Sequence, residues 1–167
     1  MAHFTTFLGN KMSQAPGAIE FWEKILLEND YMRLIEFGTY KGGLSIFFLL
    51  WSLQRKSKFY TYDNMTHKLS RIAYYLHLPE YFKKLDIFEC EEEIGKLIKL
   101  PGQTIIFCDN GDKPKELKVF SKYLKVGDII GVHDWLTEVQ LSDIPEGLQL
   151  IYLHTDKMPY TAVFEKI

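Results

Sequence analysis

Apolar positions along this chain follow two spacings, one typical of buried strands and the other typical of helices. Residues 104–108 (TIIFC) form a continuous apolar run, the pattern of a central strand that is covered on both faces. By contrast, Ile19, Trp22 and Ile25 recur at the spacing of one helical face. The pattern predicts strands at residues 34–37, 58–62, 81–85, 104–108, 129–132, 148–153 and 161–165. It predicts helices at residues 18–29, 44–54, 66–78, 89–100 and 115–125.

The order of these elements predicts the class of fold. Strands alternate with helices through the first five strands, and such crossover connections indicate a parallel, doubly wound sheet. The last two strands have no room for a helix between them and should form an antiparallel hairpin. We therefore expect an α/β fold with a mostly parallel seven-stranded sheet and an antiparallel terminal hairpin, a Rossmann-like arrangement. Residues 1–167 should form one domain, with an irregular entry segment at residues 1–17.

Two of the predicted helices carry further signals. The helix at residues 44–54 is apolar on almost every face, which is typical of a helix buried between a sheet and further structure. The helix at residues 66–78 begins at Thr66, a residue type that caps helix N-termini. Pro79 should end it, because proline cannot continue a helix.

Composition and charge exclude some classes of protein. Of the 167 residues, 47% are hydrophobic and 25% are charged, which is typical of a globular domain. The net charge is −2, so no overall field would attract nucleic acid. The first residues lack the features of a signal peptide, and the apolar run at 44–53 is too short to cross a bilayer. We therefore expect a soluble, cytoplasmic protein with no membrane or nucleic-acid partner.

The stretch at residues 33–64 contains the clearest candidate for a binding site. A predicted strand leads into a turn with Gly38, Gly42 and Gly43 and then into a helix, whose first amides have no partner within the helix. Such a turn suits an anionic or zwitterionic ligand, although the glycines could instead serve only helix–strand packing. The spacing is neither G-x-G-x-x-G nor that of a phosphate-binding loop, which argues against a nicotinamide cofactor and against nucleotide hydrolysis.

Acidic residues follow the carboxyl ends of five successive predicted strands. In an open α/β sheet, ligands bind outside these ends, near the point where the strand order reverses. Any one acidic residue there could be an ordinary turn residue, but five together indicate a ligand site. The five are Glu36, Asp63, Asp86, Asp109 and Asp134.

These motifs resemble those of a known family. IEFGTYKGGLSIFF and YTYDN resemble the first two motifs of class I S-adenosylmethionine-dependent methyltransferases. FCDNGDKPKEL and YLKVGDIIGVHDW resemble the fourth strand, the following helix and the fifth strand of that fold, and the terminal hairpin matches its last strands. FLGNKMSQAPGAIEFW resembles the entry segment of the cephalosporin-hydroxylase-like and small-molecule O-methyltransferase branch.

The resemblance implies S-adenosylmethionine as cofactor and a role for each residue of the glycine stretch. Glu36 would lie near the cofactor's ammonium group, and backbone amides of the turn would hold its carboxylate. Asp63 would bind the ribose hydroxyls, while Asn64 and Asp86 would contact the adenine. The implied cofactor-binding residues are Glu36, Gly38, Thr39, Tyr40, Gly42, Gly43, Ser45, Asp63, Asn64 and Asp86.

A second group of residues would carry the chemistry. In metal-dependent members of the branch, acidic residues after the fourth and fifth strands hold a divalent cation, which lowers the pKa of a substrate hydroxyl. The matching residues here are Asp109, His133 and Asp134. Oxygen ligands favour magnesium, whereas the imidazole shifts the choice toward manganese, iron or zinc. As an alternative, His133 and Asp134 form only a hydrogen-bonded turn.

The residue that removes the acceptor's proton is less clearly indicated. The catalytic residues implied by the resemblance are Asp109, Lys113 and His133, with Asp112 as an alternative to Lys113. Lys113 could instead simply start the next helix. Methyl transfer depends chiefly on the alignment of the reacting atoms, so a weak base does not exclude activity.

The sequence thus predicts a methyltransferase that acts on a hydroxyl of a small molecule, such as a sugar or a phenol, with or without metal assistance. The alternative is a non-catalytic domain that keeps the fold and binds S-adenosylmethionine or serves as a scaffold. Methylation of nucleic acid is opposed by the slightly acidic charge and by the absence of an Asn-Pro-Pro-Tyr-like motif.

Overall fold

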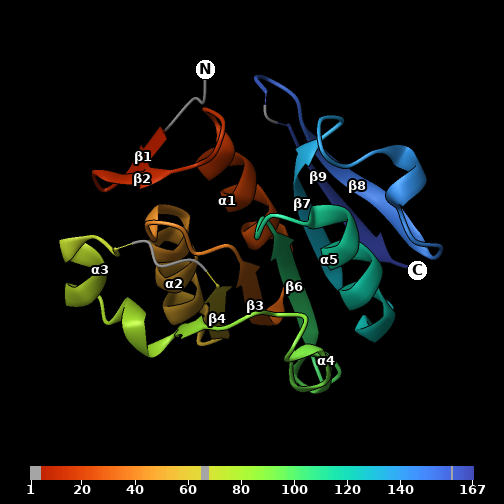
Figure 1. Cartoon of the computed structure of the whole chain (residues 1–167), viewed down its shortest axis with the longest axis horizontal. Helices are drawn as coiled ribbons and strands as arrows, with labels where there is room; N and C mark the ends of the chain where they lie inside the picture. The colour runs from red at the N-terminus through yellow and green to blue at the C-terminus, as the bar shows by residue number, and fades with distance from the viewer. Residues whose placement is uncertain (1–4, 65–67, 159) are drawn as a thin grey trace.

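A seven-stranded sheet forms the centre of the protein, with strand order β5-β4-β3-β6-β7-β9-β8 (Figure 1). The computed structural model describes residues 5–64, 68–158 and 160–167. Neighbouring strands are parallel except at β9, which is antiparallel to both β7 and β8. The predicted fold class is therefore confirmed. The strands are β3 (Tyr31–Phe37), β4 (Lys58–Asp63), β5 (Phe82–Lys84), β6 (Gln103–Cys108), β7 (Ile129–Trp135), β8 (Leu148–His154) and β9 (Tyr160–Lys166).

Helices cover both faces of this sheet. The helices α1 (Ala18–Glu28), α2 (Gly43–Arg55) and α3 (Arg71–Tyr75) pack on one face, where their apolar residues join one core cluster. The helices α4 (Glu91–Ile98) and α5 (Lys113–Phe120) pack on the other face and form a second core cluster. Short 3₁₀ turns occur at η1 (Leu78–Glu80), η2 (Ser121–Tyr123) and η3 (Leu141–Asp143). No helix in the described parts of the chain combines the length and hydrophobicity needed to cross a bilayer.

The sequence of the central strand β6 is apolar because both of its faces are buried. Successive side chains of a strand point to opposite faces of the sheet. Ile105 and Phe107 accordingly belong to the first core cluster, whereas Ile106 and Cys108 belong to the second. The predicted burial of the helix after the glycine turn is also confirmed, since most of α2 is buried.

The entry segment differs from the prediction, because residues 5–12 are not irregular. They form a hairpin of β1 (Thr5–Phe7) and β2 (Asn10–Met12), whose two-residue turn has positive φ at both Leu8 (48°) and Gly9 (76°). Such a turn matches the twist of a hairpin. The ring of Phe7 packs edge-on against Phe47 of α2 at 5.5 Å, so the hairpin lies on α2.

The helix predicted at residues 66–78 is wrong in its extent. Helix α3 begins only after Ser70, whose hydroxyl accepts a hydrogen bond from the amide of Ala73 at 3.3 Å. Thr66, the predicted cap, lies outside the described residues. Leu69 and Leu78 are buried in the first core cluster although neither lies in α3. The apolar spacing therefore reported burial correctly and helix length incorrectly.

Several other boundaries also differ from the prediction. Strand β3 begins three residues earlier than predicted. The prediction missed these residues because Arg33 interrupts the apolar pattern, although Arg33 is buried in the structure. Strand β7 continues past Val132, so that His133 and Asp134 lie within the strand instead of after it. Helix α5 starts at Lys113, two residues earlier than predicted, and η2 takes over after Phe120.

Arg33 forms hydrogen bonds with the segment that follows α4. These bonds lie at the opposite edge of the sheet from the strand ends that carry the acidic residues. One guanidinium nitrogen donates to the carbonyl groups of Leu100, Pro101 and Gly102 at 2.7, 2.8 and 2.8 Å. Its Nε donates to the hydroxyl of Thr104 at 3.2 Å. These bonds join the end of α4 to β3 and β6.

Replacing Arg33 with methionine should lower the free energy of unfolding by about 2–3 kcal/mol, because the carbonyl groups lose a charged donor. Urea denaturation followed by circular dichroism measures this change. The matched control is Arg71→Met, since Arg71 is exposed and donates to the Tyr75 hydroxyl at 3.1 Å. Its effect should be below about 0.5 kcal/mol. Equal effects of the two substitutions would contradict the role given to Arg33.

Candidate active site

The glycine turn after β3 is fixed between the ends of the two neighbouring strands. The amide of Gly38 donates to the carbonyl of Tyr62 at 2.7 Å, and the amide of Asp109 donates to the carbonyl of Phe37 at 2.9 Å. Gly38 has φ of +101°, and a Cβ there would lie 2.2 Å from the carbonyl oxygen of Asp109. Only glycine fits this position, at the point where the strand order reverses.

Asp63 at the end of β4 reaches back to the same turn. Its Oδ2 accepts a hydrogen bond from the amide of Tyr40 at 2.7 Å, and Tyr40 has a left-handed φ of 48°. Gly42, also left-handed at 82°, precedes the first residue of α2. The structure thus brings Asp63 together with the turn residues, as the sequence predicted for one binding site.

The two predicted adenine contacts lie farther along the same edge of the sheet. Asn64 is exposed directly after β4. Asp86 follows β5 and is half-buried, and its Oδ1 accepts a hydrogen bond from the amide of Phe88 at 2.9 Å. That bond is typical of a turn, so Asp86 has a structural role in addition to any contact with a ligand.

Glu36 lies behind the turn instead of lining its surface. Its side chain is 1% exposed and accepts hydrogen bonds from the hydroxyls of Ser45 and Thr61, the latter at 2.6 Å. Thr61 also shares a hydrogen bond of 2.6 Å with Thr39. Burial raises the pKa of Glu36 to about 8, although the two hydroxyl donors oppose the shift. Its Oε1 is buried with no hydrogen-bond partner among the described residues.

Residues 11–14 of the entry segment cover the turn. A Cβ at Gly43 would lie 2.5 Å from the carbonyl oxygen of Lys11, and Nε2 of Gln14 donates to Oδ2 of Asp109 at 2.8 Å. Between this segment, the turn and Asp109 there is a cavity of about 20 Å³. The sequence indicated that the segment belongs to the domain, but the contact of Gln14 was not predicted.

A second cluster adjoins the turn through Asp109. The ligand atoms of Asp109, His133 and Asp134 lie within 4.8 Å of one another. Nδ1 of His133 lies 3.2 Å from Oδ1 of Asp109 and 3.3 Å from Oδ2 of Asp134. Adjacent residues of a regular strand point to opposite faces, but Asp134 has φ of 57° and the register against β9 shifts between His133 and Trp135. This bulge accounts for the contact between neighbours.

Lys113 places its ammonium among the carboxylates of this cluster. Nζ lies 2.8 Å from Oδ2 of Asp134, 2.9 Å from Oε2 of Glu138 and 3.6 Å from Oδ1 of Asp109. Only 6% of the Lys113 side chain is exposed. The sequence did not indicate Glu138, because a residue 25 positions away in a polar loop carries no local signal.

These contacts set the protonation of the cluster. Burial alone would lower the pKa of His133, but Asp109 and Asp134 outweigh it and raise the pKa to about 9. Burial would also lower the pKa of Lys113, yet Asp109, Asp134 and Glu138 hold it above its ordinary value. Burial opposes ionisation of Asp134, but His133 and Lys113 hold its pKa well below the usual range. Both groups therefore favour their protonated forms in this cluster. Which residue removes the acceptor's proton stays a prediction.

Glu116 supports the loop that carries Asp109. It is fully buried, and its two oxygens accept hydrogen bonds from the amide of Asn110 at 3.1 and 3.4 Å. Burial raises its pKa to about 8. The sequence did not predict this residue either, because a glutamate in a helix is usually exposed.

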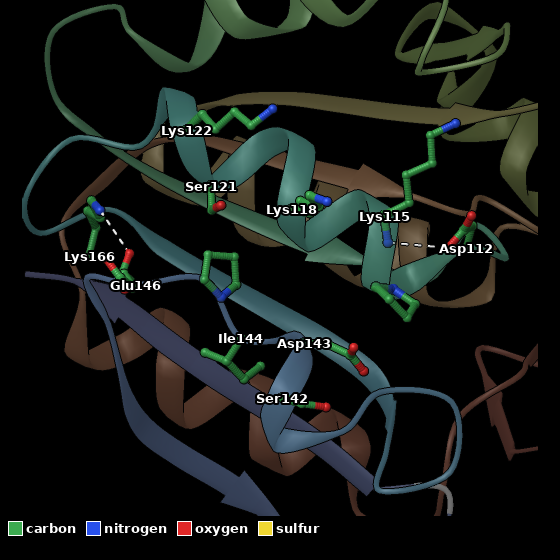
Figure 2. A pocket seen from close by; sticks show the side chains of 12 residues that line it. Asp112, Lys115, Lys118, Ser121, Lys122, Ser142, Asp143, Ile144, Glu146 and Lys166 are labelled. Carbon is green, nitrogen blue, oxygen red and sulfur yellow. Dashed lines mark hydrogen bonds between the residues drawn. The ribbon is translucent and has the colours of Figure 1, made fainter.

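A larger groove lies elsewhere on the surface. It has a volume of about 810 Å³ and lies between α5 and the segment at residues 142–146 (Figure 2). Lysines and acidic residues both line it, among them Lys118, Lys122 and Asp143. Of the predicted site residues, Asp112, the alternative to Lys113, is among the described residues that line this groove, and Lys113 itself is not.

The sheet order, the antiparallel β9 and the glycine turn define a Rossmann-like methyltransferase fold, and solved structures agree. A candidate caffeoyl-CoA O-methyltransferase from Staphylococcus aureus is 11% identical, with a TM-score of 0.69 over 92% of this chain and 85% of that chain. The O-methyltransferase TomG from Streptomyces achromogenes, involved in tomaymycin synthesis and solved with S-adenosylmethionine, is 13% identical, with a TM-score of 0.57 over 92% and 80%.

CmcI is a third similar structure. In complex with S-adenosylhomocysteine it is 14% identical, with a TM-score of 0.66 over 96% of this chain and 81% of that chain. Its complex with Mg and S-adenosylmethionine is 16% identical, with a TM-score of 0.57 over 78% and 57%. No protein-family model and no curated protein matches the sequence. At these identities the likeness shows the fold: this chain has the fold of class I S-adenosylmethionine-dependent O-methyltransferases.

The raised pKa of Glu36 predicts how stability depends on pH. The pKa is 4.5 for a free glutamate and about 8 in the fold, so folding favours the protonated group. Its stabilising contribution is therefore complete below about pH 4.5 and is lost as the pH rises through about 8. Glu36→Gln removes the titration but keeps an oxygen acceptor. The variant should gain stability relative to the native protein by up to about 1.4 kcal/mol per pH unit across this window.

Denaturation curves at a series of pH values measure this difference. The exposed Glu23→Gln substitution is the matched control and should leave the pH dependence unchanged. Parallel curves for the native protein and Glu36→Gln would show that Glu36 is already ionised in the fold.

Proposed function

We propose that this protein is an S-adenosylmethionine-dependent methyltransferase that methylates a hydroxyl group of a small molecule, such as a sugar or a phenol. One observation carries the proposal most directly. The carboxylate of Asp63, at the end of β4, is bonded to the amide of Tyr40 in the glycine turn at the point where the strand order reverses. At this point the hydrogen-bonding partners of a ribose and those of a charged amino-acid group would lie side by side.

The residues present fit the parts of the cofactor. A carboxylate suits backbone amides at a helix N-terminus, and α2 begins with Gly43 directly after the left-handed Gly42. The Asp63 carboxylate suits ribose hydroxyls. The Oε1 of Glu36, which has no partner within the described part of the chain, suits an ammonium group, and a cation beside it would favour the ionised carboxylate.

The entry segment has to move before the methionine end of the cofactor can enter. The cavity of about 20 Å³ under residues 11–14 has room for about one water molecule and not for an amino-acid group. The hairpin β1–β2 and residues 11–14 thus form a cover over the turn. Closing this cover after binding would exclude water from the transferring methyl group.

The bound cofactor would supply an electrophilic methyl group. The protein's own contribution would be to hold an acceptor hydroxyl against it, since alignment is the main requirement of this transfer. Asp109 is suited to this position, because its carbonyl contacts Gly38 and its side chain belongs to the charged cluster. A carboxylate there can accept a hydrogen bond from the acceptor hydroxyl.

A resident divalent cation fits this cluster less well than the sequence suggested. The ligand atoms of Asp109, His133 and Asp134 converge as in a metal site. However, Nζ of Lys113 lies 2.8 Å from Asp134 and 3.6 Å from Asp109. The ammonium in this place therefore opposes a cation at this cluster.

The proposal predicts that S-adenosylmethionine and S-adenosylhomocysteine bind and that Asp63→Ala abolishes binding, because the ribose loses its acceptor. Asp63→Asn, which keeps an oxygen for the amide of Tyr40, should weaken binding at least about tenfold. Isothermal titration calorimetry measures both. Asp30→Ala is the matched control, since Asp30 is exposed before β3 and should bind as the native protein does. Failure of the native protein to bind either compound would refute the proposal.

The alternative is a domain that binds the cofactor without transferring the methyl group. The raised pKa values of Lys113 and His133 favour it, because the neighbouring carboxylates make both groups poorer proton acceptors. Incubation with methyl-labelled S-adenosylmethionine and a panel of sugars and phenols separates the two. We expect label in at least one acceptor, and cofactor binding with no transfer to any of them would support the alternative.

A further inference from the structure

We infer that the ammonium group of Lys113 takes the place of a divalent cation in this site, and that Asp109, His133 and Asp134 hold no metal ion. The inference deepens the proposed function and depends on it for what the site does. The part that concerns metal binding depends only on the arrangement of the side chains around the Lys113 ammonium.

The first argument is that the space is filled. Carboxylates from three places in the chain, Asp109 after β6, Asp134 in β7 and Glu138 in the loop beyond it, converge on one point. Nζ of Lys113 lies at that point, 3.6, 2.8 and 2.9 Å from their oxygens. Divalent ions bind oxygen ligands at about 2.0–2.6 Å. An ion held by Asp109 and Asp134 together would occupy the space of the ammonium.

The second argument is that the ligand atoms already form hydrogen bonds. Oδ2 of Asp109 accepts from Gln14 at 2.8 Å, and Oδ2 of Asp134 accepts from Lys113 at 2.8 Å. Nδ1 of His133 lies within 3.3 Å of oxygens of both aspartates and therefore presents its hydrogen to them. A metal ligand has to present a lone pair instead.

The third argument is that the Lys113 side chain is held in this position. Its backbone starts α5, where Asp112 caps the helix by accepting a hydrogen bond from the amide of Lys115 at 3.2 Å, and Pro114 follows. Its side chain is 6% exposed. Moving the ammonium into solvent would leave carboxylates facing one another without compensation.

The ammonium can do electrostatically part of what a cation does. As a fixed positive charge between Asp109 and Asp134, it holds both carboxylates in place and would stabilise an acceptor oxygen that has lost its proton and is still negative before it bonds the methyl group. Lys113 is thus a positioning residue, and not the proton acceptor.

The test is a titration of the chelator-treated, full-length protein with Mn²⁺, with free Mn²⁺ followed by electron paramagnetic resonance. We expect no saturable site below millimolar Mn²⁺ in the native protein. Lys113→Met, which keeps the aliphatic length and removes the charge, should gain one site at least tenfold tighter than any native binding. Adding Asp134→Asn to this variant should remove the gained site.

Lys118→Met is the matched control, because Lys118 is an exposed lysine of the same helix, and it should behave as the native protein does. One micromolar Mn²⁺ site in the native protein that is lost in Asp134→Asn would overturn the inference, whether or not Lys113→Met folds. A folded Lys113→Met protein that gains no site would also overturn it.

Calorimetry with S-adenosylhomocysteine separates this result from the proposed function. A native protein that binds neither Mn²⁺ nor S-adenosylhomocysteine would refute the proposed function and leave the lysine's replacement of the metal standing. A native protein that binds both Mn²⁺ and S-adenosylhomocysteine would support the proposed function and refute the replacement of the metal by Lys113.

Discussion

The contact between Gly38 and the carbonyl of Asp109 is the constraint on which the rest of the site depends. No side chain fits between them, since a Cβ at Gly38 would lie 2.2 Å from that oxygen. The ends of β3 and β6 therefore touch, and the glycine turn lies directly beside the loop that begins at Asp109. A cofactor bound at the turn and an acceptor bound near Asp109 would meet across this contact, which is what a transfer between two ligands requires.

The charges around this contact are buried in two different ways. Glu36 and Glu116 are buried beside neutral donors, so burial raises the pKa of each to about 8 and favours the neutral carboxyl. Asp134 is paired with Lys113 and His133 instead, and remains ionised. Buried charges persist only where a partner compensates their desolvation. The fold thus favours a neutral carboxyl behind the glycine turn and keeps a compensated set of charges beside it.

The entry segment links these two regions. Lys11 lies against Gly43 at the start of α2, and Gln14 is bonded to Asp109. The segment therefore contacts both the glycine turn and the charged cluster. The β1–β2 hairpin gives this cover a defined structure, since Phe7 anchors it to Phe47.

The sequence by itself determined the alternation of strands and helices, and through it the parallel sheet and the terminal hairpin. It also determined that the acidic strand ends share one edge, because parallel strands all end there. These features depend on local apolar spacing and on chain order, and both can be read directly from the residues. The glycine turn and Asp63 could be predicted as neighbours for the same reason.

Only the tertiary structure decided the features that depend on contacts between distant residues. The ammonium of Lys113 meets Glu138 from 25 positions away, and Gln14 meets Asp109 from 95. The left-handed Asp134 turns two adjacent side chains of β7 toward one cluster, against the alternation of a regular strand. Helix α3 is shorter than its apolar spacing suggests, because packing on the core, and not helix length, is what that spacing records. Local pattern specifies which residues are buried; packing across the sheet decides which of them meet.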